Sequence, residues 1–163
     1  MPKQKIKNSK EMEKISRELK NQNKKIVTTN GVFDILHAGH VKYLQSAKSM
    51  GDCLIVAINS DSSVKKIKGN KRPINNERDR ADVLEAMECV DFITIFEEEE
   101  PSAILEAIKP EIHAKGGDYG KGRMVEKKAV EKNNGKVVLV KFEEGYSTTG
   151  TINKILALYG NNK

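Results

Sequence analysis

Two histidines separated by two residues are the part of the chain best suited to chemistry. His37 and His40 flank Ala-Gly in a turn that directly follows an apolar run, and apolar residues at helical spacing come after it. A neutral imidazole donates one hydrogen bond and a protonated one donates two, so the pair can hold oxygens of a transferring phosphoryl group. A helix beginning just past a strand's carboxyl end is also where α/β proteins bind phosphates. The turn therefore indicates phosphate handling.

The surroundings of the turn favour this interpretation over its alternatives. Two polar residues at a helix start would not need Gly39 or the Asn30-Gly31 pair, which let the backbone approach a ligand closely. No serine or cysteine stands nearby for a histidine to activate, and no third zinc ligand stands at helical or turn spacing. Lys42, early in the helix, is either a solvated lysine or a cation that balances the charge of a phosphate.

Two later segments also follow apolar runs. In Ala114–Tyr119, a glycine pair leaves room for a nucleobase or ribose and Asp118 can accept from hydroxyls, or the segment is simply a turn. In Glu144–Thr149, the hydroxyls of Ser147 and its neighbours either cap a helix or cradle a triphosphate. Since the carboxyl ends of parallel strands share one edge of a sheet, we expect these segments to lie beside the histidine turn.

Several other polar residues are weaker candidates. Arg72, Arg78 and Arg80 precede a helical segment and suit a phosphate, although ion pairs with nearby carboxylates are the alternative for at least two of them. The string Asn59–Asp61 ends a strand at the same expected edge, and His113 is interpreted as a packed side chain within a short strand. The chain has neither the Gly-x4-Gly-Lys-Ser/Thr motif of P-loop proteins nor the Gly-x-Gly-x-x-Gly motif of ordinary dinucleotide-binding proteins, so neither class is predicted.

Strands and helices alternate along the chain, and this alternation predicts the scaffold. The expected strands have continuous apolar cores, as parallel strands covered on both faces do. The predicted fold is therefore α/β: a Rossmann-like, doubly wound sheet of about five parallel strands with helices on both faces. The expected strands are Lys25–Asn30, Cys53–Asn59, Asp91–Phe96, Glu111–Lys115 and Lys136–Phe142, and the expected helices include 41–47, 83–90, 104–108 and 152–159.

Length and composition describe one soluble domain. A chain of 163 residues, 37% hydrophobic and 32% charged, suits a single domain over residues 24–163. A flexible start and a short amphipathic helix at about 9–21 make up residues 1–23; the helix packs on the domain or on a partner subunit, and a homodimer is expected. No apolar run is long enough to span a membrane and the polar N-terminus is no signal peptide, so a cytoplasmic protein is expected.

The net charge of +6 does not indicate a nucleic-acid partner. The basic residues do not cluster, and only four Tyr, four Phe and no Trp are available for stacking. A lysine-rich surface that attracts a polyphosphate accounts for the charge equally well. Cys53 and Cys89 lie far apart in apolar surroundings, which is typical of buried, reduced thiols. No metal ligated by the protein itself is expected.

Together these segments resemble a known superfamily. His37-Ala-Gly-His40 is similar to the HxGH signature of the nucleotidyltransferases, and Ser147-Thr-Thr149 resembles their C-terminal phosphate motif. Within that superfamily the chain most resembles the D-glycero-β-D-manno-heptose 1-phosphate adenylyltransferases, in the stand-alone form without a kinase domain. The matching strings run in order over nearly all of residues 24–160: Thr29–Val41, Asn59–Asp61, Lys68-Gly69, Arg72-Pro73, Lys115–Tyr119 and Glu144–Thr149. Val32 stands where that family usually has Cys, and residues 120–127 are less typical.

The resemblance implies a reaction and a set of roles. A sugar phosphate oxygen attacks the α-phosphorus of ATP in line and pyrophosphate leaves, with Mg²⁺ bridging the phosphates, so the implied product is ADP-heptose. The implied catalytic residues are His37, His40 and Lys42. The implied nucleotide- and phosphate-binding residues are Asn30, Gly31, Phe33, Gly39, Arg80, Lys115, Gly117, Asp118, Ser147, Thr148 and Thr149. The implied acceptor-binding residues are Asp34, Asn59, Asp61, Lys68 and Arg72.

Three alternatives stay open. A cytidylyltransferase acting on glycerol 3-phosphate or another alcohol phosphate shares HxGH and the Ser-Thr-Thr motif but tends to lack Asn-Gly and Lys-Gly-Gly-Asp-Tyr. An FAD synthetase of archaeal type is another enzyme of the superfamily. The third is a non-catalytic nucleotide-binding module, against which the intact histidines, Lys42 and the Ser-Thr-Thr motif argue.

Overall fold

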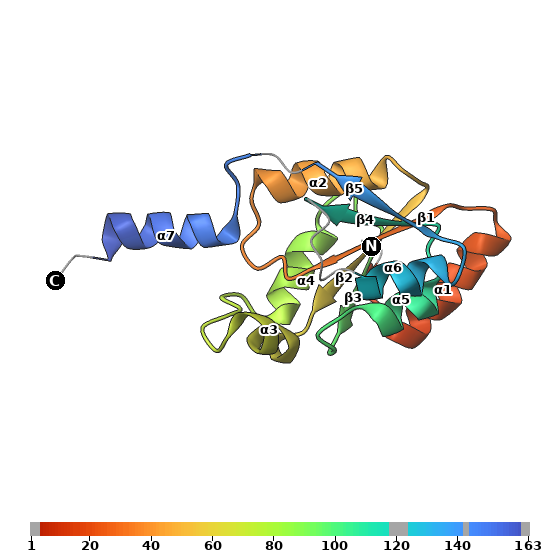
Figure 1. The fold of residues 1–163 in the computed structure, drawn as a ribbon, viewed down its shortest axis with the longest axis horizontal. Helices are drawn as coiled ribbons and strands as arrows, with labels where there is room; N and C mark the ends of the chain where they lie inside the picture. Colours follow the sequence, from red (N-terminus) through yellow and green to blue (C-terminus); the bar gives the residue numbers. More distant parts are fainter. Residues whose placement is uncertain (1–3, 118–123, 142–143, 161–163) are drawn as a thin grey trace.

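The computed structural model describes residues 4–117, 124–141 and 144–160, among which five strands form one sheet. The strand order is β3-β2-β1-β4-β5, and every neighbouring pair is parallel (Figure 1). The chain changes its winding direction between β1 and β4, and open α/β sheets bind ligands at such a switch point. The strands are β1 (Ile26–Gly31), β2 (Cys53–Asn59), β3 (Phe92–Phe96), β4 (Ile112–Gly116) and β5 (Lys136–Val140).

The predicted fold class is confirmed. Each predicted strand coincides with an observed one apart from small shifts at its ends. The predicted end of the last strand, Phe142, lies outside the described residues. The continuous apolar runs arise because the central strands are covered on both faces, and every residue of β2 is buried.

Helices cover both faces of the sheet. α2 and α4 pack on one face, α1 and α5 pack on the other, and α6 packs on α5 and β5. The sequence did not predict α3 and α6, because each is a short, lysine-rich segment in which helical periodicity has little length to show itself. The helices of the described residues are α1 (Ser9–Asn21), α2 (Ala38–Lys48), α3 (Asp61–Lys68), α4 (Glu77–Glu85), α5 (Ser102–Ile108), α6 (Met124–Glu131) and α7 (Thr148–Tyr159).

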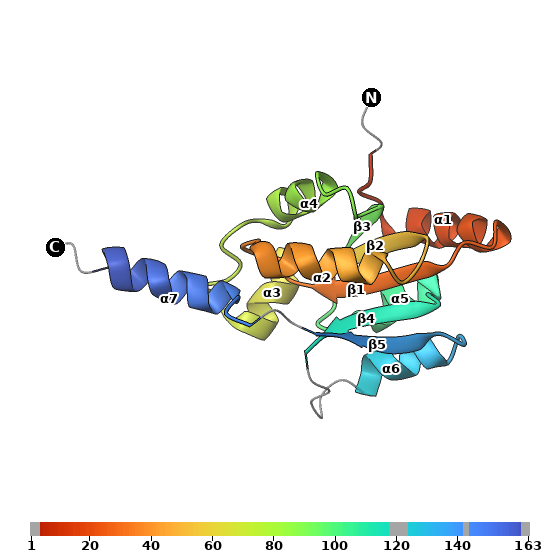
Figure 2. The same ribbon diagram turned by 90° about the horizontal axis from the view of Figure 1, so that it is seen from above.

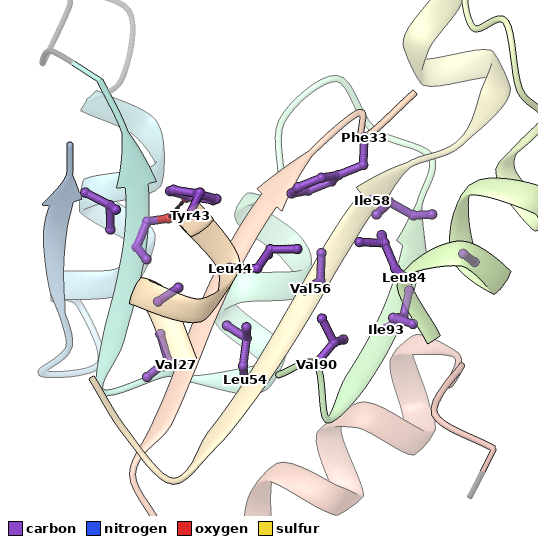
Figure 3. Close-up of a cluster of buried hydrophobic side chains, with 14 of the residues drawn as sticks. Val27, Phe33, Tyr43, Leu44, Leu54, Val56, Ile58, Leu84, Val90 and Ile93 are labelled. Atoms are coloured by element: carbon purple, nitrogen blue, oxygen red, sulfur yellow. Dashed lines mark hydrogen bonds between the residues drawn. The ribbon is translucent and has the colours of Figure 1, made fainter. Parts of the chain in front are cut away.

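Side chains of β2 alternate between two hydrophobic clusters, one on each face of the sheet. Leu54, Val56 and Ile58 belong to the cluster that includes Leu44 of α2 and Leu84 of α4 (Figure 3). The residues between them in β2 belong to the cluster under α1 and α5. This two-residue alternation is typical of a strand with a core on either side, and it fixes the face of the sheet to which each side chain of β2 points.

The N-terminal segment is tied to the body of the protein. α1 begins at a reciprocal capping box between Asn8 and Glu11, and its apolar side chains pack in the cluster that it shares with α5 and the sheet. Residues 5–7 exchange backbone hydrogen bonds with Ile93 in β3. The predicted helix at 9–21 is confirmed, but residues 5–7 are anchored rather than loose, and the apolar face of α1 is covered by its own chain.

α7 stands apart from the other helices. It projects beyond the sheet in both views, and none of its residues is buried (Figures 1 and 2). Its amino end contacts the loop that follows β1. Large apolar side chains on the rest of the helix are exposed to solvent: Ile155, Leu156, Leu158 and Tyr159.

No helix in the described parts of the chain is both long and apolar enough to cross a membrane.

Candidate active site

The two histidines of the turn cap the start of α2 and bind each other. The backbone N–H of His40 donates to Nδ1 of His37 at 3.4 Å, and that of His37 donates to Nδ1 of His40 at 3.3 Å. The rings stack with their centroids 3.8 Å apart. Because each Nδ1 accepts a hydrogen bond, the proton of each neutral ring resides on Nε2. The turn therefore fixes both imidazoles as Nε2–H donors.

Both imidazoles are neutral at physiological pH. Burial, and after it the nearby His37, lower the pKa of His40 to about 4. Burial also lowers the pKa of His37 below its ordinary value of 6.5. The pair can therefore donate hydrogen bonds to a phosphoryl group without carrying charge before the ligand arrives.

The start of α7 lies against the histidine turn. The ring of Tyr146 stacks on His37 with a centroid distance of 5.7 Å, and Thr148 Oγ1 donates to the carbonyl of Ile35 at 3.4 Å. Ser147 is the N-cap, and its Oγ accepts from the backbone N–H of Gly150 at 2.8 Å. As expected from the sheet edge, the Ser-Thr-Thr segment and the histidine turn lie side by side, with the N-terminus of α7 beside the imidazoles.

Tyr146 is a site residue that the sequence analysis did not single out. The only local signal is its position directly before the N-cap Ser147, which says nothing about a partner in a distant loop. In the structure its ring contacts His37, His37 stacks on His40, and His40 contacts Phe33. The centroids of the His40 and Phe33 rings are 5.4 Å apart. These ring contacts fix the orientation of both imidazoles by packing.

A pocket opens between the carboxyl ends of β1 and β4. Its lining combines residues from the end of β1, from α2 and from the end of β4, so it lies at the topological switch point. The lining residues are Asn30, Gly31, Val32, Phe33, His40, Tyr43, Lys115 and Gly116. Thus one of the two histidines shares a pocket with the predicted Asn30-Gly31 and Lys115 positions.

Within the described parts of the chain, oxygens of Asn30 and Glu126 hold Lys115 in this pocket. Its Nζ donates to Oδ1 of Asn30 and to Oε1 of Glu126, each at 2.8 Å. Glu126 belongs to α6, which the sequence did not predict, so no signal pointed to it. Gly117 has a φ of 81°, a conformation that favours glycine, and its N–H donates to Val140 in β5. Asp118 lies outside the described residues.

Tyr43 joins α2 to both strands beneath the pocket. Its hydroxyl lies 2.6 Å from Thr29 Oγ1 in β1 and donates to the carbonyl of Ala114 in β4 at 2.9 Å. The ring belongs to the buried cluster shown in Figure 3. Tyr43 follows His40 by nearly one helical turn, so these hydrogen bonds hold the start of α2 against the carboxyl ends of β1 and β4.

Asp34 and Arg72, which were both expected to bind the acceptor, contact each other in the structure. Asp34 is buried and accepts from Arg72 Nε at 2.6 Å and from the backbone N–H groups of Ile74 and Asn75. Burial alone would raise the pKa of Asp34, but the hydrogen bonds from Asn75, Ile74 and Arg72 outweigh it and lower the pKa. The pair anchors residues 72–75 to the loop after β1.

Arg80 likewise serves the scaffold in this structure. Its guanidinium is fully buried and donates to the carbonyls of Asn75 and Val32 and to Asp61. Arg80 was expected to bind phosphate and Asp61 to bind the acceptor. In this structure the guanidinium of Arg80 and the carboxylate of Asp61 form an ion pair with each other. Asn59 is buried too, and its amide donates to Ser63.

The remaining predicted residues lie at the surface. Lys42 is exposed on α2 next to the histidines, Lys68 is exposed at the end of α3, and Thr149 is exposed in the first turn of α7.

Arg78 and His113 have the structural roles that the sequence analysis considered for them. Arg78 forms an ion pair with Asp82 on α4, which was the alternative to a phosphate-binding role. His113 is packed in the core with Nδ1 2.8 Å from Thr28 Oγ1, which confirms its interpretation as a core residue.

The low histidine pKa values make stability depend on pH. Burial, with a smaller contribution from Lys115, lowers the pKa of His113 to about 3, and that of His40 is about 4. Below pH 6.5 the unfolded chain takes up protons that the folded protein does not. Stability is therefore full above pH 6.5 and declines as pH falls, by about 1.4 kcal/mol per pH unit for a buried histidine and less for the partly exposed His40.

Urea titrations between pH 7 and 5 measure this decline in the free energy of unfolding. A His40→Asn variant should show a shallower decline than the wild type, because one of the titrating groups is gone. An equal slope in both proteins would contradict the assignment of a neutral, partly buried His40.

Gly39 is needed because two segments meet over it. A Cβ at this position would lie 2.9 Å from Cβ of Tyr146 and 3.0 Å from the ring of His37. We expect Gly39→Ala to displace the start of α7 or the His37 ring and to lower kcat by about 10- to 100-fold. Removing the opposing atoms in Gly39→Ala/Tyr146→Gly should restore part of the rate. Steady-state kinetics decide, and a wild-type kcat for Gly39→Ala would mean that the segments do not approach this closely.

Known proteins share both the sequence pattern and the fold. Residues 28–155 match the model of the cytidylyltransferase-like family. The chain is 50% identical over 156 residues to the bifunctional protein HldE of Geobacter metallireducens, an alignment that covers 96% of this chain and 32% of that protein. It is 52% identical over 150 residues to the bifunctional protein HldE of Aliarcobacter butzleri, covering 92% and 31%. The chain thus spans about a third of the length of these relatives.

Solved structures extend the comparison. A lipopolysaccharide core biosynthesis protein from Thermoplasma volcanium is 29% identical, with a TM-score of 0.61 over 76% of this chain and 99% of its own. A pantoate-beta-alanine ligase from Francisella tularensis, complexed with beta-gamma ATP and beta-alanine, has a TM-score of 0.62 over 93% of this chain and 78% of its own. At 18% identity, the ligase shares the fold alone. Because the cytidylyltransferase-like model spans most of the chain, the protein belongs to that family and is a nucleotidyltransferase.

Proposed function

We propose that this protein transfers AMP from ATP to D-glycero-β-D-manno-heptose 1-phosphate, releasing pyrophosphate and forming ADP-heptose. The observation that carries the proposal is the contact between the histidine turn and the start of α7, made by Tyr146 on His37 and by Thr148 on Ile35. Two neutral imidazoles and a helix N-terminus beside one another suit a triphosphate. The choice of heptose and adenine rests on the resemblance of the Asn-Gly and Lys-Gly-Gly-Asp-Tyr strings and on the similarity to the HldE proteins.

The proposed reaction requires positioning more than covalent chemistry. An oxygen of the sugar phosphate forms a bond to the α-phosphorus of ATP, and the bond from that phosphorus to the bridging oxygen of pyrophosphate breaks. The Nε2–H groups of His37 and His40 donate to oxygens of the five-coordinate phosphorus as charge builds on them. The start of α7, with Ser147, Thr148 and Thr149, holds the β- and γ-phosphates, and Lys42 balances charge near the incoming phosphate.

Mg²⁺ is proposed to enter with ATP as part of the substrate. Among the described residues no group of three or more His, Cys, Asp or Glu side chains is arranged to hold a metal ion, and the pocket lining contains no carboxylate. Mg²⁺ that is bound mainly by substrate phosphates and water needs no such group. The protein's own contribution would then be limited to orienting the phosphates that carry the ion.

One assay tests the proposed function. The protein is incubated with Mg²⁺, each nucleoside triphosphate in turn and a panel of phosphorylated acceptors, and released pyrophosphate is measured. The expected result is release with ATP and the heptose 1-phosphate. A preference for CTP with glycerol 3-phosphate would replace the adenylyl proposal by a cytidylyl one. Absence of pyrophosphate from every combination would favour a non-catalytic nucleotide-binding module.

We also propose a homodimer, with α7 rather than α1 as its surface. The face of α1 on which that expectation rested is covered by its own chain, whereas Leu156 and Tyr159 of α7 are 60% and 69% exposed. A second copy of this helix would remove such side chains from water. Light scattering coupled to gel filtration should give a dimer mass, and Leu156→Glu should give a monomer. A monomer mass for the wild type at all concentrations would dismiss the proposal.

The proposed compartment is the cytoplasm, and nucleic acid is not proposed as a partner. Cys53 and Cys89 are free thiols in the structure. Burial raises the pKa of Cys53 to about 12 and also raises that of Cys89, so both stay protonated and unreactive. Unpaired, protonated thiols are typical of proteins kept in a reducing compartment.

A further inference from the structure

The guanidinium of Arg80 lies in the protein interior and reaches the backbone of the candidate active site. The side chain is 0% exposed. Its Nε donates to the carbonyl of Asn75 at 3.0 Å, and its Nη2 donates to the carboxylate of Asp61 at 2.9 Å. Its Nη1 donates to the carbonyl of Val32 at 2.6 Å, and Val32 lines the pocket between β1 and β4. A buried residue of α4 therefore holds one wall of the pocket.

This contact fixes the direction of the next backbone N–H. The peptide between Val32 and Phe33 is trans, so its carbonyl and its N–H point in opposite directions. The carbonyl points to Arg80 of α4, which contacts β2 and β3, whereas the pocket lies on the other side of β1, toward β4 (Figure 3). The N–H of Phe33 is thus turned to the side of the pocket, and it has no hydrogen-bond partner among the described residues.

The backbone of Phe33 is held in this direction from two sides. Its φ is 50°, which is uncommon for a bulky residue and persists only where the surrounding structure enforces it. Arg80 holds the preceding carbonyl. On the other side the ring packs over Gly31, where a Cβ would lie 2.9 Å from it, and against His40. Phe33 and His40 line the same pocket, so the backbone N–H and the imidazole are fixed relative to each other.

We propose that Arg80 is a positioning residue for the transfer step: through the carbonyl of Val32 it directs the N–H of Phe33 at a non-bridging oxygen of the α-phosphorus. Charge builds on that oxygen in the transition state, where a preorganised backbone donor stabilises it. Arg80 acts without touching the nucleotide, unlike the phosphate contact that the sequence resemblance implied for it. The inference rests on the proposed function in one respect, since it takes the α-phosphate of the nucleotide to enter this pocket.

The amide signals of phenylalanine test the hydrogen bond directly. The chain has four Phe, so protein labelled with ¹⁵N-phenylalanine gives few signals, and Phe33→Leu identifies the one from Phe33. An ATP analogue with a methylene group between its α- and β-phosphates is added together with Mg²⁺. We expect the amide proton of Phe33 to move downfield in the wild type and to move clearly less in Arg80→Lys, in which one ammonium replaces the planar fork. A Phe33 signal that does not move downfield in the saturated wild type, or that moves equally in both proteins, would overturn the proposal.

Sulfur at the α-phosphorus separates positioning from a general loss of structure. The two diastereomers of ATPαS each replace one non-bridging oxygen by sulfur, a weaker hydrogen-bond acceptor. We expect Arg80→Lys to lower kcat with ATP by about 10- to 100-fold, at or below the effect of removing one preorganised donor. The loss should be clearly smaller with one diastereomer, because the wild type already lacks that hydrogen bond there. Equal losses with ATP and with both diastereomers would assign Arg80 a structural role only and overturn the proposal.

A second residue of the same helix supplies the matched control. Leu84 lies about one helical turn after Arg80 and is fully buried. Leu84→Ala destabilises α4 by leaving a cavity but keeps the guanidinium, so it should retain the downfield shift and the wild-type response to sulfur. If it repeated the results of Arg80→Lys, weakening of α4 alone would explain them and the proposal would fall.

Two further comparisons complete the design. Arg80→Gln, with a shorter side chain, should repeat the results of Arg80→Lys and takes its place if that variant does not fold; a wild-type shift and kcat in Arg80→Gln would count against the proposal. The proposed function fails separately, if the wild type neither binds the ATP analogue nor releases pyrophosphate. Binding and turnover without the downfield shift of Phe33 would contradict this inference alone.

Discussion

Replacing His40 with alanine is expected to lower kcat by about 10²–10³-fold, the effect of removing one preorganised donor from a charged transition state. The imidazole of His40 is neutral, because burial lowers its pKa to about 4, and its Nδ1 is occupied by the backbone N–H of His37. Only Nε2–H is therefore left to act on the phosphoryl group. Turnover at saturating substrates measures the loss.

The fold should survive this change. The change removes a long hydrogen bond and the ring contacts with Phe33 and His37, which are small beside the buried cluster beneath them. Urea unfolding of His40→Ala should therefore stay within about 1 kcal/mol of the wild type. His40→Gln, which retains an N–H donor, should recover part of the rate. Near-normal kcat in His40→Ala would remove the histidine turn from the mechanism.

Replacing Asp34 with alanine is expected to cost about 3–5 kcal/mol of stability, the effect of leaving a buried charge without its partner. The side chain of Asp34 is 0% exposed and that of Arg72 is 15% exposed. The same carboxylate also accepts the backbone N–H groups of Ile74 and Asn75, which lose their acceptor together with Arg72. Urea unfolding measures the loss, and Asp34→Ala/Arg72→Ala should recover part of it because no unpaired guanidinium remains.

Asp82→Ala is the matched control for this prediction. It breaks the ion pair between Arg78 and Asp82, whose side chains are 64% and 51% exposed, respectively. It should therefore change the free energy of unfolding by no more than about 1 kcal/mol. If Asp34→Ala were as stable as this control while raising KM for the acceptor alone, Asp34 would be an acceptor-binding residue, as the sequence resemblance implied. The hydrogen bonds from Arg72, Ile74 and Asn75 are the basis for the anchoring role.

The scaffold and the histidine turn were predictable because their signals are local. Each strand is a continuous apolar run, and the His-Ala-Gly-His turn, Lys115 and the Ser-Thr-Thr segment all stand at strand ends, where a parallel sheet brings its loops together. The structure places the turn against Ser147–Thr149 and places His40 and Lys115 in one pocket.

The pairing of charges was not predictable, because it depends on contacts between distant segments. Arg72 meets Asp34 across 38 residues of chain, and Arg80 meets the carbonyl of Val32 across 48. A sequence shows that an arginine stands near a phosphate motif, but it does not show which distant carboxylate or carbonyl accepts the hydrogen bonds of that arginine. Glu126 was missed for a related reason, since α6 is too short and too rich in lysine to stand out by periodicity.

The most direct test of the central claim is the identity of the product. ATP, Mg²⁺ and D-glycero-β-D-manno-heptose 1-phosphate are incubated with the protein and followed by ³¹P nuclear magnetic resonance. The expected result is loss of the ATP signals with the rise, in equal amounts, of pyrophosphate and of the two coupled phosphorus signals of a sugar diphosphate diester. Conversion of ATP to ADP and inorganic phosphate, or an unchanged spectrum, would contradict the transfer of AMP at this site.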